Sequence, residues 1–114
     1  MLVKTNFHQA RLQSLYTREI SLILQKIVPQ LNLPLFSVSY CSLSAKAENL
    51  KVYLIFVKEE DKNFLSVINK KCVPLVIKHL AKSKKFARLP KIIFLLDQKI
   101  KEFNELETII QKIK

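Results

Sequence analysis

Residues 35–57 read LFSVSYCSLSAKAENLKVYLIFV, and this stretch decides the fold. Its two halves, Leu35 to Leu43 and Leu50 to Val57, each alternate between two sets of side chains, which is typical of a half-buried strand. The polar connection Ser44–Asn49 is short, so the two strands are predicted to pair as an antiparallel hairpin. The predicted faces of the first strand are Phe36, Val38 and Tyr40 on one side and Ser37, Ser39 and Cys41 on the other.

A helical pattern precedes the hairpin. From about Phe7 to Val28, apolar residues recur at spacings of three and four, which is typical of an amphipathic helix. Thr5 or Asn6 is predicted to cap its start, and Pro29 is predicted to end it near Ile27. The apolar stripe consists of Leu12, Tyr16, Ile20, Ile23, Leu24, Ile27 and Leu31.

A second helical pattern follows the hairpin, from Asp61 to about Lys85. The acidic residues Glu59, Glu60 and Asp61 stand where a helix start favours negative charge. Pro74 lies in the middle of the pattern, and proline removes a backbone donor and clashes with the preceding turn. The sequence therefore predicts two helices here, or one sharply kinked helix.

Two further elements complete the chain. The apolar run from Lys91 to Asp97 predicts a buried strand, and the pattern from Ile100 to Ile113 predicts a terminal helix. The expected order is α–β–β–α–kink–α–β plus a C-terminal helix. It predicts an α+β fold in which residues 1–114 form a single domain, a three-stranded sheet with helices on one face.

The composition excludes several kinds of site. The 114 residues include no glycine, so neither a P-loop nor a glycine-rich dinucleotide turn can form, and left-handed backbone must be held by residues that carry a β-carbon. The two cysteines and two histidines lack metal-ligand spacing. The serines of the first strand and its loop, Ser37, Ser39, Ser42 and Ser44, have no nearby histidine with a matching acid. We expect no enzyme activity, no metal, no cofactor and no small-molecule substrate.

The apolar runs are far shorter than the ~20 residues of a membrane helix, so a cytoplasmic protein that binds no membrane is expected.

Positive charge is concentrated in one part of the chain. The formal net charge is +11, and residues 61–91 carry nine basic residues against the single acid Asp61. At about 100° per residue, Lys71, Lys78, Lys82 and Lys85 fall within a narrow arc of a helix. A solvated face normally mixes charges of both signs, so this arc predicts a surface that binds a polyanion such as nucleic acid.

The candidate binding residues come from this stretch and from the first helix. They are Arg11, Arg18, Lys70, Lys71, Lys78, Lys82, Lys84, Lys85, Arg88 and Lys91. Charge alone leaves three kinds of partner open: RNA, duplex DNA as in a nucleoid module, and an acidic protein.

Several strings, in this order and spacing, resemble the ribosome-binding factor A family over roughly residues 11–97. They are Arg18–Leu24 (REISLIL), Val38–Ser44 (VSYCSLS), Ala47–Leu54 (AENLKVYL) and Leu89–Asp97 (LPKIIFLLD). The resemblance implies a KH-like domain of the bacterial type (type II). It also implies a monomeric, non-enzymatic factor that binds small-subunit rRNA on free 30S subunits or their late precursors. Such a factor would aid late assembly and 5′-end processing, notably in the cold.

The resemblance carries over to particular residues. The family's basic position in the helix after the kink matches Lys78, its basic run before the proline matches Lys85 and Arg88, and its arginine pattern in the first helix matches Arg11 and Arg18. The chain departs from the family at Cys72-Val73-Pro74-Leu75, where the family usually has Ala-x-Gly. Proline can supply a kink but not the close approach of glycine to a phosphate, so side chains are expected to make the RNA contacts.

Overall fold

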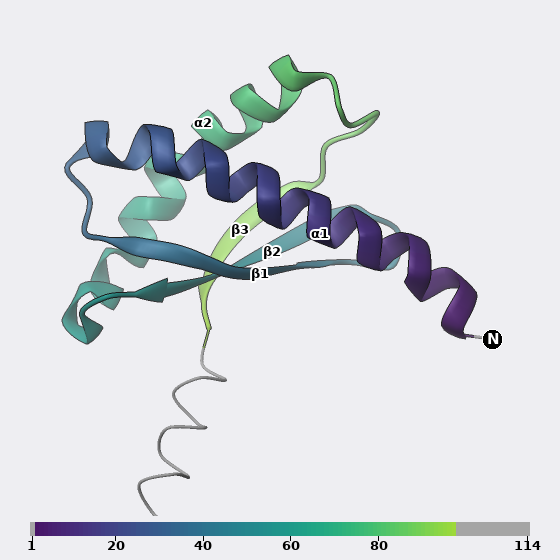
Figure 1. The fold of residues 1–114 in the computed structure, drawn as a ribbon. Helices are drawn as coiled ribbons and strands as arrows, with labels where there is room; N and C mark the ends of the chain where they lie inside the picture. The colour runs from purple at the N-terminus through teal and green to yellow at the C-terminus, as the bar shows by residue number, and fades with distance from the viewer. Residues whose placement is uncertain (1, 98–114) are drawn as a thin grey trace, which may run out of the picture.

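Two long helices lie side by side over one face of a three-stranded sheet (Figure 1). The computed structural model describes the backbone of residues 2–97 and the side chains of residues 8–97. The elements in chain order are α1 (Leu2–Ile27), η1 (Val28–Leu31), β1 (Phe36–Leu43), β2 (Asn49–Phe56), η2 (Glu59–Phe64), α2 (Leu65–Ser83) and β3 (Lys91–Leu96). The terminal helix predicted at residues 100–113 lies outside the described residues.

The sheet is mixed, with the strand order β1-β2-β3. β1 and β2 form the predicted antiparallel hairpin, with Leu43 opposite Leu50. β3 lies parallel to β2 on its other side, with Lys91 opposite Asn49. Parallel neighbours need a crossover connection, and η2 with α2 supplies it. The crossover places α2 beside α1 on the same face of the sheet, which confirms the predicted α+β architecture.

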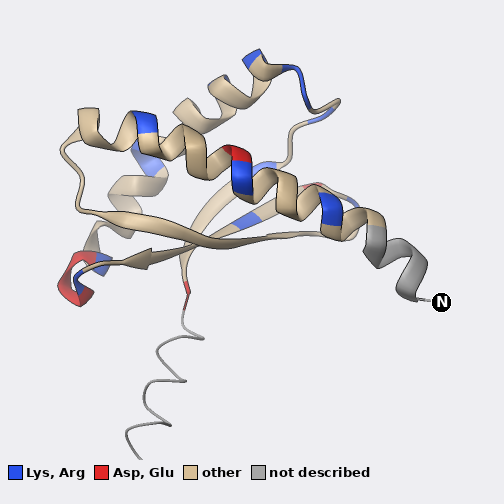
Figure 2. Cartoon of the chain, in the orientation of Figure 1, with Lys and Arg blue, Asp and Glu red and all other residues tan. Residues whose placement is uncertain are grey.

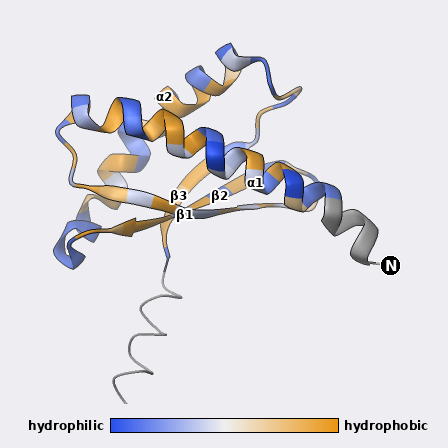
Figure 3. Cartoon of the chain, viewed as in Figure 1, coloured by the Kyte–Doolittle hydropathy of each residue, from blue (hydrophilic) through white to orange (hydrophobic). Residues whose placement is uncertain are grey.

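The core fills the space between the helix layer and the sheet. Leu50, Val52 and Leu54 point into it from the central strand, and each is at most 1% exposed. Figure 3 shows α1 alternating along its length between hydrophobic and hydrophilic bands, whereas η2 is mostly hydrophilic and the segment after α2 changes between the two. The other members of the hydrophobic core are Tyr16, Ile20, Leu24, Ile27, Val28, Cys41, Leu43, Ile68, Cys72, Val76, Leu80, Ile92 and Phe94.

Side chains from the helices also close the two edges of the sheet. On β1, the Gln13 Oε1 atom accepts a hydrogen bond from the Leu43 N–H at 2.8 Å, and the Thr17 hydroxyl accepts one from the Cys41 N–H at 3.1 Å. On β3, the Asn69 side chain donates to the Phe94 carbonyl at 2.9 Å and accepts from its N–H at 2.7 Å. An edge strand with unpaired backbone groups invites pairing with another chain, and these contacts remove that template.

Because of a β-bulge, the side chains of β1 point to other faces than the alternation predicts. The register shifts between Val38 and Tyr40, so Val38 lies opposite the buried Leu54 while Tyr40 lies opposite Tyr53. Tyr40 and Val38 therefore point to opposite sides of the sheet, and the prediction that they share a face is wrong. The extra residue of the bulge, Ser39, causes this change of face.

Both helices also differ from the sequence prediction. α1 begins at Leu2, so Thr5 and Asn6 lie inside it rather than capping it, although its end at Ile27 is confirmed. α2 is one helix that continues through Pro74, so of the two alternatives predicted there the split into two helices is wrong. Pro74 is exposed, so water can hydrate the Lys70 carbonyl that loses its intrahelical partner.

The prediction that β3 is a buried strand holds for one of its faces only. Ile92 and Phe94 are buried under the helices at 8% and 0% exposure, but Ile93 between them is 46% exposed. Within residues 2–97, α1 and α2 cover only one side of the sheet, as Figure 1 shows. The other side of β3 therefore points away from the core.

Residues with a β-carbon hold the left-handed backbone, as the absence of glycine predicts. They are Asn32, Ala47 and Lys84, with φ of 53°, 59° and 56°. Each stands where the chain changes direction: after η1, in the hairpin turn and after α2.

Candidate nucleic-acid interface

The basic residues gather on the helix layer and on the segment that follows α2. Figure 2 shows Lys and Arg along α1, at the end of α2 and between α2 and β3, while acidic residues mark η2 at the opposite end. All ten candidate residues are exposed. They come from α1 (Arg11, Arg18), α2 (Lys70, Lys71, Lys78, Lys82), the following segment (Lys84, Lys85, Arg88) and the start of β3 (Lys91).

The lysines of α2 lie away from its buried stripe. Ile68, Cys72, Val76 and Leu80 recur every four residues and are buried against the sheet. Three lysines, Lys71, Lys78 and Lys82, fall within an arc of about 40° on a helix with 3.6 residues per turn. The helix ends at Ser83, so the prediction that Lys85 continues this arc is wrong. Lys85 belongs to the segment after the helix.

Lys84 ends α2 and turns the chain toward β3. It adopts a left-handed conformation (φ 56°, ψ 21°), and its N–H donates to the Ala81 carbonyl at 3.4 Å. The Ser83 hydroxyl donates to the Leu80 carbonyl at 2.7 Å, which satisfies one of the open carbonyl groups of the last turn. Lysine side chains at this end also interact favourably with the negative end of the helix dipole.

The segment after α2 is held against α1 by an aromatic contact. Tyr16 of α1 stacks on Phe86 with ring centroids 4.2 Å apart and an interplanar angle of 7°. The Tyr16 hydroxyl donates to the Arg88 carbonyl at 3.4 Å, and burial raises the pKa of Tyr16 above its ordinary value. These contacts fix the backbone between Lys84 and Arg88, so its cations have a defined position beside α1.

One of the candidate cations has an internal partner. The Lys85 ammonium group forms an ion pair with Glu19 of α1, whose side chain is only 14% exposed. Lys85 is therefore partly neutralised within the protein, which sequence reasoning missed because the two residues are 66 positions apart. The roles of Tyr16 and Phe86 were missed for the same reason, since no local pattern indicates their stacking.

The opposite end of the helix layer is acidic. The first turn of η2 contains Glu59, Glu60 and Asp61. The Lys62 Nζ atom lies 3.8 Å from the Glu59 Oε1 atom and forms an ion pair with it. The helix layer is thus acidic where α2 begins and basic where it ends. A polyanion approaching the molecule is attracted to the α2 end and repelled from the η2 end.

Other kinds of site receive little support from the described side chains. Among residues 8–97, no group of three His, Cys, Asp or Glu residues could hold a metal ion. Burial raises the pKa of the Cys41 and Cys72 thiols above the ordinary value, and this disfavours the reactive thiolate. None of the helices in the described part is long and apolar enough to cross a membrane.

Comparison with known proteins identifies related chains. The family model described as Ribosome-binding factor A matches residues 8–110. The fold resembles the crystal structure of ribosome-binding factor A from Thermus thermophilus, with a TM-score of 0.61 and 24% sequence identity to this chain. The match covers 77% of this chain and 94% of that chain. A solution NMR structure of a Thermotoga maritima protein, provisionally assigned as a ribosome binding factor A, is 23% identical with a TM-score of 0.60. That match covers 76% of this chain and 88% of the other. No curated protein sequence matches. These likenesses confirm the predicted KH-like fold.

Proposed function

Because the chain belongs to the ribosome-binding factor A family, whose model spans residues 8–110, we propose that it is a non-enzymatic maturation factor of the small (30S) ribosomal subunit. Membership of the family implies a ribosome-associated function. The finer proposal is that the chain binds small-subunit rRNA on free 30S subunits as a monomer. It would aid late assembly and 5′-end processing, with the greatest need in the cold.

The observation that carries the proposal is the basic end of the helix layer. We define the helix-layer surface as Arg11, Arg18, Lys70, Lys71, Lys78, Lys82, Lys84, Lys85, Arg88 and Lys91, all of which are exposed. Lysine and arginine side chains that neutralise phosphates release counterions, which gives salt-dependent affinity with little sequence preference. The stretch in which the family usually has a glycine contains Pro74 and no glycine here, so side-chain contacts to phosphates are the mode that this surface supports.

The test is cosedimentation of the purified protein with separated small subunits, large subunits and whole ribosomes at moderate salt. We expect the protein to migrate with free small subunits. The variant Lys78→Glu/Lys82→Glu should lose this binding, because it reverses charge in the arc of α2. The matched control is Lys58→Glu/Lys62→Glu, which changes the net charge equally at the acidic end and should still bind.

Equal binding to all particles, or to none, would contradict the proposal. Equal loss in both charge variants would mean that total charge, rather than the helix-layer surface, determines affinity. Circular dichroism of each variant checks that the exposed substitutions leave the fold intact.

A further inference from the structure

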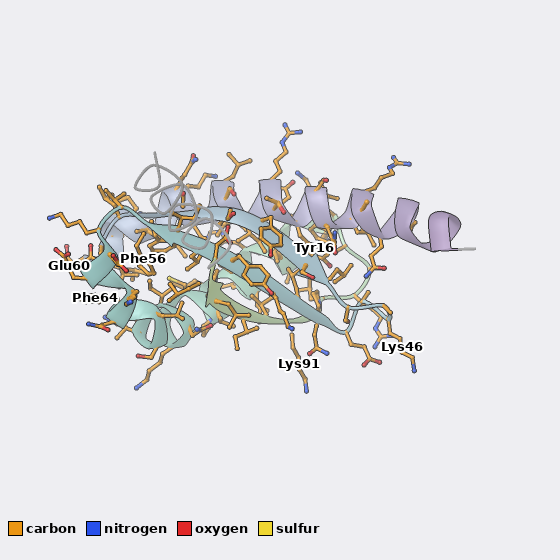
Figure 4. The ribbon with its side chains drawn as sticks, turned by 90° about the horizontal axis from the view of Figure 1, so that it is seen from below. Tyr16, Lys46, Phe56, Glu60, Phe64 and Lys91 are labelled. Carbon is orange, nitrogen blue, oxygen red and sulfur yellow. The ribbon has the colours of Figure 1, made fainter. Side chains whose placement is uncertain are left out.

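The second face of the sheet carries a set of side chains that, apart from Lys91, the helix-layer surface does not use. Figure 4 views the molecule from this side and labels Lys46 and Lys91 at one end of the sheet. Strand alternation and register place Tyr40 and Ser42 of β1, Lys51, Tyr53 and Ile55 of β2, and Lys91, Ile93 and Leu95 of β3 on this face. No helix within residues 2–97 covers it.

Two aromatic rings stack at the centre of this face. The ring centroids of Tyr40 and Tyr53 are 4.5 Å apart and the rings are inclined by 14°. The β-bulge of β1 produces this pair, because it turns Tyr40 away from the core and toward Tyr53. Both tyrosines are partly exposed, and the neighbouring Ile93 is 46% exposed. The face thus presents planar and apolar groups to its surroundings.

Lysines lie beside the rings. Lys51 is exposed and occupies the position before Tyr53 on the same face of β2, about 7 Å away along the strand. Lys91 is exposed at the start of β3, next to the hairpin turn that carries Lys46, because its N–H donates to the Glu48 carbonyl at 2.9 Å. Lys46, Lys51 and Lys91 therefore lie toward this end of the sheet, where Glu48 of the turn is acidic. The carboxylate of Asp97 lies beyond the other end of β3 and accepts a hydrogen bond from Ser39.

This combination fits one chemistry. Unpaired bases stack on aromatic side chains, and lysines beside the stack neutralise the phosphates that connect them. We propose that the sheet platform, defined as Tyr40, Lys51, Tyr53, Lys91 and Ile93, is a second RNA site that binds an unpaired segment. The inference rests on the proposed RNA-binding function and adds the class of RNA bound. A duplex would not bind here in the same way, because its bases are already stacked on one another.

The platform and the helix-layer surface lie on opposite sides of the sheet. One molecule can therefore contact the backbone of folded rRNA with its helices and an unpaired strand with its sheet. The two sites use different residues, apart from Lys91 at their boundary, so each can be disabled without the other.

Tyrosine fluorescence provides a direct test. The chain has three tyrosines and no tryptophan, and Tyr16 is only 3% exposed on the helix side of the sheet. A change in emission on adding RNA that is lost in Tyr53→Leu therefore reports the sheet platform rather than Tyr16. We expect a short oligouridylate to quench the emission, and a self-complementary RNA duplex of the same length to quench it much less.

Variants then identify the residues. Tyr53→Leu removes the ring and should weaken oligouridylate binding by about tenfold or more, which is the effect of losing one base stack. Tyr53→Phe retains a ring and should bind nearly as well, measured by electrophoretic mobility or anisotropy of labelled RNA. Lys51→Glu should weaken binding, whereas Lys58→Glu, an equal charge change outside the platform, should have a smaller effect.

The outcomes separate this inference from the proposed function. Equal quenching by duplex and oligouridylate, no quenching by either, or unchanged affinity in Tyr53→Leu would each overturn the platform, and none of these bears on subunit binding. Conversely, Lys78→Glu/Lys82→Glu should lose cosedimentation with small subunits while its tyrosine emission is still quenched by oligouridylate. If the unaltered protein does not cosediment with small subunits, the proposed function is rejected, whether or not oligouridylate quenches the tyrosine emission.

Discussion

The two faces of the sheet are built from the same strands but meet different surroundings. In β3, Phe94 is fully buried under the helices while its neighbour Ile93 is 46% exposed. In β2, the buried Val52 stands between the exposed Lys51 and the partly exposed Tyr53. The helix side is a packed interior that sets stability, and within the described residues the other side presents partly exposed side chains. Substitutions on the two faces should therefore affect different properties of the protein.

The largest contrast is expected within β3. Phe94→Ala removes a fully buried ring and should lower the free energy of unfolding by ~3–5 kcal/mol, because of the lost transfer free energy and the cavity left behind. Ile93→Ala should lower it by less than ~1 kcal/mol, because much of the side chain is already in water. Urea denaturation of both variants measures the difference. Similar losses in the two variants would mean that both faces of β3 are buried in solution.

A smaller effect is expected where α2 closes the edge of β3. Asn69→Ala leaves the Phe94 N–H and carbonyl without their partner and should cost ~1–3 kcal/mol. The control is Asn63→Ala, an exposed position in η2, which should change stability by less than ~0.5 kcal/mol. Urea denaturation compares the two variants. An Asn69→Ala variant as stable as its control would show that water replaces the edge contact at no cost.

The smallest effect concerns pH and lies on the buried face of β1. Burial raises the pKa of Cys41 in the folded protein above its ordinary value of 9.0. Above about pH 9 the thiol therefore ionises in the unfolded chain while it stays protonated in the folded one, so stability falls as pH rises. One such group contributes at most ~1.4 kcal/mol per pH unit. Chemical denaturation between pH 8 and 10 should show a smaller decline in Cys41→Val than in the unaltered chain. An identical decline in both would locate the titration elsewhere.

The sequence predicted the elements well, because each has a local pattern. The alternation in residues 35–57 located both strands of the hairpin to within about one residue of their observed ends. Pro29 correctly ended α1 at Ile27. The absence of glycine correctly predicted that residues with a β-carbon, such as Asn32, hold the left-handed backbone. These features depend on neighbours in the chain, which a single sequence contains.

The features that were missed depend on contacts between distant segments. The bulge beside Val38 follows from cross-strand register, and the exposure of Ile93 follows from which face the helices cover. The ion pair joins Lys85 to Glu19, and the Asn69 side chain forms hydrogen bonds with the Phe94 backbone. Both contacts join residues from different elements. Of the candidate site, the sequence therefore predicted the residue types and their exposure. It could not predict which cation is neutralised internally.

The left-handed backbone at Lys84 places two demands on one residue. Glycine would hold φ 56° without the cost, on the order of 1 kcal/mol, that a side chain incurs in this conformation. It would also remove a cation from the segment that Tyr16 and Phe86 hold in place. Under the proposed function, a more stable fold favours glycine at this position, whereas tighter attachment to a polyanion favours lysine. Lysine is then the compromise in which the end of a helix also contributes a cation to the helix-layer surface.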